Sequence, residues 1–205
     1  EVIERPLSIV KELIENSIDA GSSQIVIEIK NGGKSYIRVT DNGSGIVSDE
    51  IELAFERHAT GKISKLSDLD HINTLGFRGE ALASITAISR LTVYSKTADS
   101  ELGTKLKMQG GTTVSIEKTG MNTEVEYEEI GAPDGTSIII RDIFYNTPAR
   151  RKFMKSDAAE ATVIIDMIQK IAIYYSHIAF RLINNKQTVI ATPGTGDILT
   201  TIQSI

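Results

Sequence analysis

The chain of 205 residues contains no cysteine, no tryptophan and only three histidines. Without cysteine, disulfide scaffolds, thiolate zinc sites and cysteine nucleophiles are excluded. The histidines are scattered without metal-ligand spacing and no nucleophile elbow is present, so zinc sites and serine hydrolysis have no support. No apolar run approaches the ~18 residues that span a bilayer, and no basic and then apolar leader opens the chain. These absences indicate neither a membrane-spanning nor a secreted protein.

The residues that are present have the composition of an ordinary folded domain. Hydrophobic residues make up 40% and charged residues 24%, and 22 basic against 27 acidic side chains give a net charge of −5. A chain of this length can bury a core without metals or crosslinks, and we expect one domain over residues 1–205. The chain starts without Met and stops inside an apolar segment, so we expect both ends to have been cut from a longer protein.

Apolar periodicity predicts an α+β fold. Pro6 and the apolar residues that follow it at helical spacing predict a helix over 6–20, and alternation predicts a hairpin that turns at Asn31–Gly33. Residues 60–79 predict a long loop, and 119–134 an exposed excursion. Further predicted elements are helices near 49–58 and 79–88, strands near 91–94, 103–108, 112–117 and 136–141, a helix capped by Ser156 with an apolar stripe of Val163, Met167, Ile171 and Tyr175, and a last hairpin turning at Asn184–Asn185. Together they predict a two-layer sandwich, in which a mixed, mainly antiparallel sheet carries helices on one face.

The first predicted helix has an unusual polar stripe. Glu12, Glu15, Asn16 and Asp19 fall within about a quadrant at 100° per residue, opposite the apolar stripe. Glu12 and Asn16 lie one turn apart, where two side chains can meet one ligand. An amide oxygen suits magnesium and a carboxylate can take a proton from water, which fits phosphate hydrolysis. A solvated helix face is the alternative interpretation.

Two glycine-containing segments can likewise be interpreted either as parts of a ligand site or as ordinary loops and turns. Asp41 ends a predicted strand and is followed by Gly43 and Gly45, so it offers a fixed acceptor beside a backbone that a planar ring such as adenine can approach. The segment Gly76–Leu82 is a glycine-flanked turn that enters a helix, a junction attractive to phosphate. The alternatives are a plain loop and a plain packing turn.

Two common nucleotide motifs are absent. Gly33-Lys34-Ser35 has Glu28 where a P-loop needs its first glycine, and Lys62 is followed by Ile63 rather than Ser or Thr. Gly43-Ser44-Gly45 is completed by Ser48 and precedes no βαβ unit, so a dinucleotide-binding fold is unsupported.

Four ordered motifs resemble the GHKL ATPase superfamily and, more narrowly, the MutL family of DNA mismatch repair proteins. They are Glu12–Gly21, Asp41–Ile46, Gly76–Leu82 (Gly-Phe-Arg-Gly-Glu-Ala-Leu) and Phe144–Phe153 (Phe-Tyr-Asn-Thr-Pro-Ala-Arg-Arg-Lys-Phe). The last two motifs count against two rivals of the same superfamily, a sensor histidine kinase and a type II topoisomerase. A non-catalytic interaction scaffold with the same fold is the rival from another class.

The resemblance implies that the chain binds ATP with Mg²⁺ and hydrolyses ATP. Glu12 matches the family's general base, Asn16 its magnesium ligand and Asp41 its adenine-binding aspartate, while Thr136 resembles the threonine that closes the base pocket. Lys62 and the turn Gly76–Gly79 match a lid over the triphosphate, which we place at about 60–79. The complete set of implied nucleotide contacts is Asn16, Ala20, Asp41, Gly43, Gly45, Thr60, Lys62, Leu75, Gly76, Phe77, Arg78, Gly79, Leu82 and Thr136.

The resemblance also implies partners. Members normally carry an N-terminal strap and a following transducer subdomain, and they form homodimers on ATP binding and respond to a mismatch-recognition protein of the MutS type. Because both pieces lie outside this chain, we expect the isolated 205 residues to bind ATP-Mg, turn it over weakly and stay largely monomeric. We expect a cytoplasmic, bacterial protein that associates with the nucleoid during repair. A basic segment suggests contact with the DNA backbone through Arg150, Arg151, Lys152 and Lys155, although a solvated turn is the alternative.

Overall fold

The computed structural model describes residues 3–55, 79–119 and 134–205. The described residues form one eight-stranded sheet in the order β5-β4-β3-β6-β2-β1-β7-β8. All neighbouring strands are antiparallel except β1 and β7. The strands are β1 (Gln24–Lys30), β2 (Tyr36–Asp41), β3 (Arg90–Lys96), β4 (Gly103–Gln109), β5 (Thr112–Thr119), β6 (Gly135–Arg141), β7 (Ala179–Asn184) and β8 (Gln187–Ala191).

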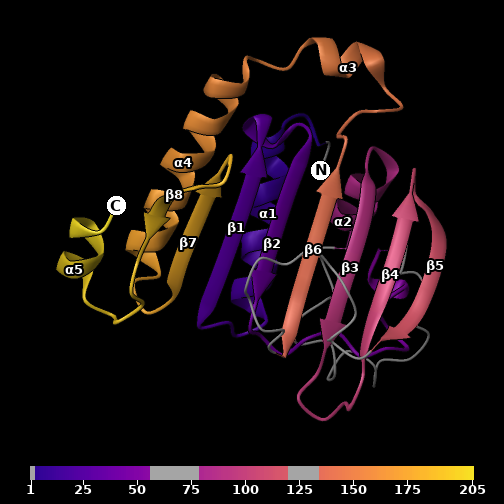
Figure 1. Ribbon diagram of the computed structural model, residues 1–205, viewed down its shortest axis with the longest axis horizontal. Coiled ribbons are helices and arrows are strands. Elements are labelled where there is room, and N and C mark those ends of the chain that lie inside the picture. Colours follow the sequence, from indigo (N-terminus) through magenta and orange to yellow (C-terminus); the bar gives the residue numbers. More distant parts are fainter. Residues whose placement is uncertain (1–2, 56–78, 120–133) are drawn as a thin grey trace, which may run out of the picture.

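Helices cover one face of this sheet, as Figure 1 shows for α1, α2 and α4. A single hydrophobic core lies between the two layers, in which Ile9 and Leu13 of α1 and Ile27 of β1 are buried. The predicted α+β sandwich with a mixed, mainly antiparallel sheet is confirmed. The helices are α1 (Pro6–Asp19), α2 (Gly79–Ala87), α3 (Pro148–Lys152), α4 (Asp157–Tyr174) and α5 (Ile198–Gln203), with 3-10 turns η1 (Asn31–Gly33) and η2 (Leu53–Phe55).

Strand register brings two segments distant in sequence to the same end of the sheet. Thr40 pairs with Ser137, so β2 ends where β6 begins. Asp41 and Thr136 are therefore neighbours at this end. The opposite end carries the β1–β2 turn η1 and, after β6, the helix α3 (Figure 1).

Three predictions about the helices need correction. Residues 49–55 form a turn and η2 instead of an α-helix, because Glu50 and Phe55 donate to the carbonyls of Val47 and Glu52, three residues back; residues 56–58 lie outside the described residues. The buried stripe of α4 is Ala161, Ile164, Ile168 and Ala172, one residue round from the predicted stripe, whose members are only partly buried. The short helices α3 and α5 were not predicted.

The other predicted elements agree with the structure within about two residues at their ends. Ser156 caps α4, and its side chain accepts from the Ala159 amide at 3.3 Å. Most of the predicted excursion at 119–134 and of the predicted loop at 60–79 lies outside the described residues. Within the part of the chain that is described, no helix is long and apolar enough to cross a membrane.

Candidate functional site

A cavity of about 210 Å³ lies at the end of the sheet where β2 stops and β6 starts. Its walls come from α1, from the segment after β2, from α2 and from β6. Most of the wall is apolar, and a few polar groups converge on it. The lining residues are Leu13, Asn16, Ser17, Asp19, Ala20, Val39, Asp41, Ser44, Gly45, Ile46, Val47, Glu50, Ala54, Phe55, Leu82, Thr136 and Ile138. Such a combination is typical of a small-molecule site.

Asp41 is the most constrained polar group of this cavity, with 7% of its surface exposed. Its Oδ2 accepts a hydrogen bond from the Ser17 hydroxyl at 2.7 Å. Its Oδ1 accepts from the Gly43 amide at 2.9 Å and from the Thr136 amide at 3.3 Å. Three elements therefore hold one carboxylate in a fixed orientation. Because a carboxylate has about four acceptor positions, one remains for a donor that enters the cavity.

Burial raises the pKa of Asp41 above its ordinary value. The hydrogen bonds from Ser17, Gly43 and Thr136 favour the ionised form and oppose part of this rise. Burial deprives the Asp41 carboxylate of hydration. A ligand that donates a further hydrogen bond therefore offsets part of this desolvation free energy. The electrostatics of Asp41 thus fit ligand binding better than fold stabilisation.

The segment after β2 is pinned to the neighbouring strands. The Ile46 amide donates to the Ser95 hydroxyl of β3 at 2.8 Å, and Ser95 also shares a hydrogen bond of 2.8 Å with the Thr136 hydroxyl. Gly45 has a φ of 72°, and a Cβ added to it would lie 2.2 Å from the Lys96 carbonyl oxygen. Glycine is therefore required here by packing against the end of β3, a reason different from the ring approach that the sequence suggests.

The middle of α1 forms the opposite wall. Asn16 lines the cavity, and its Nδ2 is buried without a hydrogen-bond partner among the described residues. Glu12, one turn earlier, is only 9% exposed. The alternative of a solvated helix face therefore does not hold for Glu12, which is buried together with Ile9 and Leu13. Asp19 at the end of the helix is exposed, as that alternative expects.

The structure brings together six of the residues singled out from the sequence, Asn16, Ala20, Asp41, Gly45, Leu82 and Thr136. Among the described residues, Glu12 and Gly43 are not part of the cavity wall. Glu12 lies next to Asn16 on α1, Gly43 holds Asp41 through its amide, and Gly79 begins α2. The predicted contacts Thr60, Lys62, Leu75, Gly76, Phe77 and Arg78 lie outside the described residues.

Sequence reasoning missed Ser17 and most of the apolar wall. Apart from Glu12, the other buried residues of α1 are apolar, so an unexplained hydroxyl next to Asn16 is the signal that could have identified Ser17. Val39, Ile46 and Ile138 were not predicted as site residues, because periodicity does not distinguish a cavity wall from a packed interior.

The basic segment lies at the other end of the sheet. Arg150, Arg151 and Lys152 are exposed on α3, and Lys155 is exposed in the link to α4. Phe153 between them is 88% exposed. The geometry of α3 therefore leaves these cations accessible, remote from the cavity (Figure 1).

Comparison with known proteins gives one family and a consistent set of relatives. Residues 4–131 match the family described as histidine kinase-, DNA gyrase B- and HSP90-like ATPase. The DNA mismatch repair protein MutL of Clostridium acetobutylicum is 51% identical over 205 residues, which cover 100% of this chain and 31% of that protein. MutL of Agathobacter rectalis is 50% identical over 197 residues, 96% of this chain and 29% of that protein.

Two solved structures are similar to this chain over almost its full length. The Aquifex aeolicus MutL ATPase domain complexed with ADP superposes with a TM-score of 0.74 at 26% identity, covering 99% of this chain and 69% of that one. The N-terminal domain of a DNA repair protein superposes with a TM-score of 0.78 at 30% identity, covering 99% of this chain and 57% of that one. The chain spans about 30% of the length of these curated relatives.

Proposed function

Because the chain belongs to the histidine kinase-, DNA gyrase B- and HSP90-like ATPase family and corresponds to the ATPase domain of MutL mismatch repair proteins, we propose that its cavity at Asp41 is the ATP site. The observation that carries this proposal is a buried, ionisable acceptor held by three elements at the wall of an apolar cavity.

Asp41 would recognise the adenine ring. Its remaining acceptor position can take a hydrogen bond from the exocyclic amino group, and Val39, Ile46 and Ile138 offer apolar surface to the ring. Thr136 closes the same wall and holds Asp41 through its amide. A purine without this amino group would leave a buried carboxylate unsatisfied, so the site discriminates against it.

Hydrolysis would take place along α1. Glu12 would take a proton from the attacking water, and burial restricts the solvent around its carboxylate. Asn16 lines the cavity wall and would hold Mg²⁺ through its side-chain carbonyl oxygen, which is a hard ligand of the kind that this ion prefers. When bound, Mg²⁺ would neutralise charge on the phosphate oxygens.

The rest of the mechanism belongs to the complete protein. Residues 60–79, with Thr60, Lys62, Leu75, Gly76, Phe77, Arg78 and Gly79, would form the lid over the triphosphate, and Leu82 on α2 would support it. Closure of this lid would exclude water from the site and expose a surface that binds a second copy, so that ATP binding promotes homodimer formation. We propose that this switch couples a MutS-type mismatch-recognition protein to strand processing.

The basic residues Arg150, Arg151, Lys152 and Lys155 are proposed to contact the DNA backbone. They are exposed and grouped on a chain whose net charge is −5. A phosphate contact of this kind weakens as salt rises, and affinity that ignores salt would contradict it. The bacterial relatives favour a cytoplasmic location, near the nucleoid during repair.

A calorimetric titration with ATP-Mg tests the function directly. We expect heat of binding and, at 100 times the Kd, an increase of about 2.7 kcal/mol in the free energy of unfolding. If neither is observed, the chain is a non-catalytic interaction scaffold that keeps the fold.

Glu12→Ala separates binding from turnover in the complete protein. ATP-Mg affinity should be kept, because Asp41 and the apolar wall are unchanged, whereas the rate of phosphate release should fall to background. Glu15→Ala, which removes a half-buried carboxylate less than one turn from Glu12 on α1, is the matched control and should retain turnover. Equal loss in both variants would argue against Glu12 as the base.

A further inference from the structure

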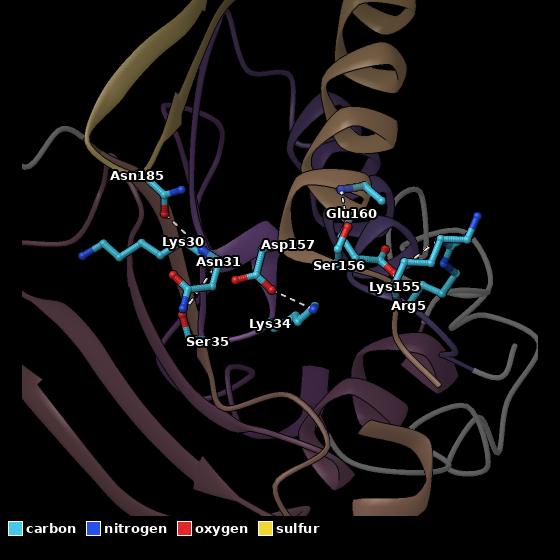
Figure 2. A network of polar contacts seen from close by, with 11 residues as sticks. Arg5, Lys30, Asn31, Lys34, Ser35, Lys155, Ser156, Asp157, Glu160 and Asn185 are labelled. Atoms are coloured by element: carbon cyan, nitrogen blue, oxygen red, sulfur yellow. Dashed lines mark hydrogen bonds and ion pairs between the residues drawn. The ribbon is translucent and has the colours of Figure 1, made fainter. Parts of the chain in front are cut away.

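A second polar cluster lies at the opposite end of α1 from the cavity. Arg5 is the N-cap of α1, and Glu160 lies in the first turn of α4. The Glu160 Oε1 accepts from the Arg5 Nη2 at 3.3 Å and from the Lys155 amide at 2.9 Å. Figure 2 shows these residues gathered at the N-terminus of α4. The two helices are thereby joined through one carboxylate.

Glu160 is buried to an unusual degree for a carboxylate. Its side chain is 0% exposed, and its Oε2 has no hydrogen-bond partner within residues 3–55, 79–119 and 134–205. Burying a carboxylate costs several kcal/mol, and a well-packed apolar side chain at such a position often stabilises a fold equally well. Stability alone therefore does not explain an ion pair at this place. A requirement for a fixed geometry between α1 and α4 explains the ion pair.

The helix α4 itself cannot shift easily, because its first turn rests on the β1–β2 turn. A Cβ added to Gly32 would lie 2.5 Å from the Asp157 carbonyl oxygen and 2.9 Å from the Glu160 Cβ. The Lys34 Nζ also pairs with an Asp157 carboxylate oxygen at 2.7 Å (Figure 2), but this partly exposed pair adds little to the contact that fixes α4. Glu160 is thus a rigid reference point against which the start of α1 is held.

Arg5 is the N-cap of α1 and has an extended backbone with φ −148° and ψ 156°, directly before Pro6 of the first turn. Its side chain is therefore anchored at the start of the helix that carries Glu12 and Asn16. The rise along the axis from Pro6 to Glu12 is about 9 Å. Because the helix moves as one element, a displacement of its start shifts both side chains.

The adenine end of α1 is held by separate contacts. Ser17 donates to Asp41, and the Ser44 amide donates to the Ala20 carbonyl at 3.0 Å. These contacts do not involve Arg5 or α4. Loss of the Arg5–Glu160 pair should therefore disturb the stripe of Glu12 more than the binding of the base.

We propose that Arg5 and Glu160 are positioning residues for ATP turnover, which set the axial position of α1 and with it the carboxylate of Glu12. This inference rests on the proposed ATPase function. It adds a requirement that lies remote from the cavity, at the junction of α1 and α4.

The test compares Glu160→Gln, Arg5→Ala and Arg5→Lys in the complete protein. Glu160→Gln keeps an acceptor for the Lys155 amide but removes the charge that holds Arg5. A misplacement of about 1 Å can cost ~100-fold in rate, so we expect kcat to fall at least tenfold in Glu160→Gln and Arg5→Ala. The Kd for ATP-Mg should change less than twofold. Arg5→Lys, which can still pair with Glu160, should recover part of kcat.

Asp157→Asn is the matched control. It removes an ion pair from the same turn of α4, but that pair holds η1 and not α1. Turnover of Asp157→Asn should equal that of the unmodified protein. Melting curves identify variants that do not fold, and Arg5→Lys then carries the test as the mildest change.

Two results would overturn the positioning role. One is an unchanged kcat in folded Glu160→Gln and Arg5→Lys. The other is a fall in kcat matched by an equal loss of ATP affinity, which a merely structural role produces. If the unmodified protein neither binds nor hydrolyses ATP, the proposed function fails instead, and the two failures are distinguishable.

Discussion

At the scale of single residues, Asp41 is held by three hydrogen bonds and is almost completely buried. Burial raises its pKa, which means that the ionised form is less stable in the folded protein than in the unfolded chain. The charge of Asp41 therefore lowers the stability of the fold, a cost that the proposed role in ligand recognition explains.

Asp41→Asn should abolish ATP binding without weakening the fold. The Asn carbonyl can accept from the Gly43 and Thr136 amides, and Ser17 can accept from the new amide, but the acceptor for the adenine amino group loses its charge. We expect the free energy of unfolding at neutral pH to be unchanged or increased, because no charge is buried. Chemical denaturation measures this, and a loss above about 1 kcal/mol, typical of a broken buried hydrogen bond, would contradict it.

The affinity for ATP should depend on pH through the same group. The ionised carboxylate accepts the hydrogen bond, so affinity falls as the pH falls through the pKa of Asp41. Since that pKa is raised, the loss should begin at a higher pH than for an ordinary aspartate, whose pKa is about 3.9. Without nucleotide, the sign is reversed: protonation favours the folded state, so this group adds stability as the pH falls from the raised pKa towards its ordinary value.

Calorimetric titrations across mildly acid pH check the first part, and melting curves without nucleotide check the second. The Asp41→Asn protein is the reference in the melting curves, because it lacks the titrating group. An ATP affinity that stays constant down to the range of an ordinary aspartate would contradict a raised pKa for Asp41.

At the scale of elements, the sequence predicts the order of helices and strands well. The hairpin of β1 and β2, the capped helix α4 and the last hairpin have local signals, namely alternation, an N-cap serine and an Asn turn. The stripe of α4 was assigned one residue away, because Val163 and Ile164 are equally apolar and only tertiary packing selects between them. The segment 49–55 has a helix start signal, yet only the Ala54 amide donates four residues back, to Glu50, whereas Glu50 and Phe55 donate three residues back. Ile51 and Phe55 are buried in this arrangement.

Site residues could be predicted from the sequence where the amino acid is unfavourable for the secondary structure around it. Asn16 within a helix and Asp41 at a strand end both indicate a ligand and both lie on the cavity wall. The burial of Glu12 and the contact of Ser17 with Asp41 depend on how α1 packs against the sheet, which the periodicity of one helix does not specify.

Ser156→Ala tests the start of α4 as an element. The Ser156 hydroxyl satisfies the amide of Ala159, so its loss should lower the free energy of unfolding by about 1 kcal/mol. Ser156→Asp should restore it, because a carboxylate also caps a helix and favours its positive end. Urea denaturation measures both, and equal stability of the three proteins would contradict a role for the cap.

At the scale of the whole molecule, the sheet separates two functions. One end carries the proposed ATP cavity, and the other carries the Arg5–Glu160 pair and the basic helix α3 (Figure 1). The helix α1 runs between the two ends, with Arg5 at its start and Ser17 near its finish. This arrangement places the proposed general base midway between a binding contact and a structural anchor.

The most direct test of the account is a crystal structure of the protein with a non-hydrolysable ATP analogue and Mg²⁺. We predict the adenine ring in the cavity between α1 and β6, with its amino nitrogen within a hydrogen-bond distance of about 3 Å from the Asp41 carboxylate. The phosphates should point towards Asn16. An adenine ring bound elsewhere, with no contact to Asp41, would contradict the account.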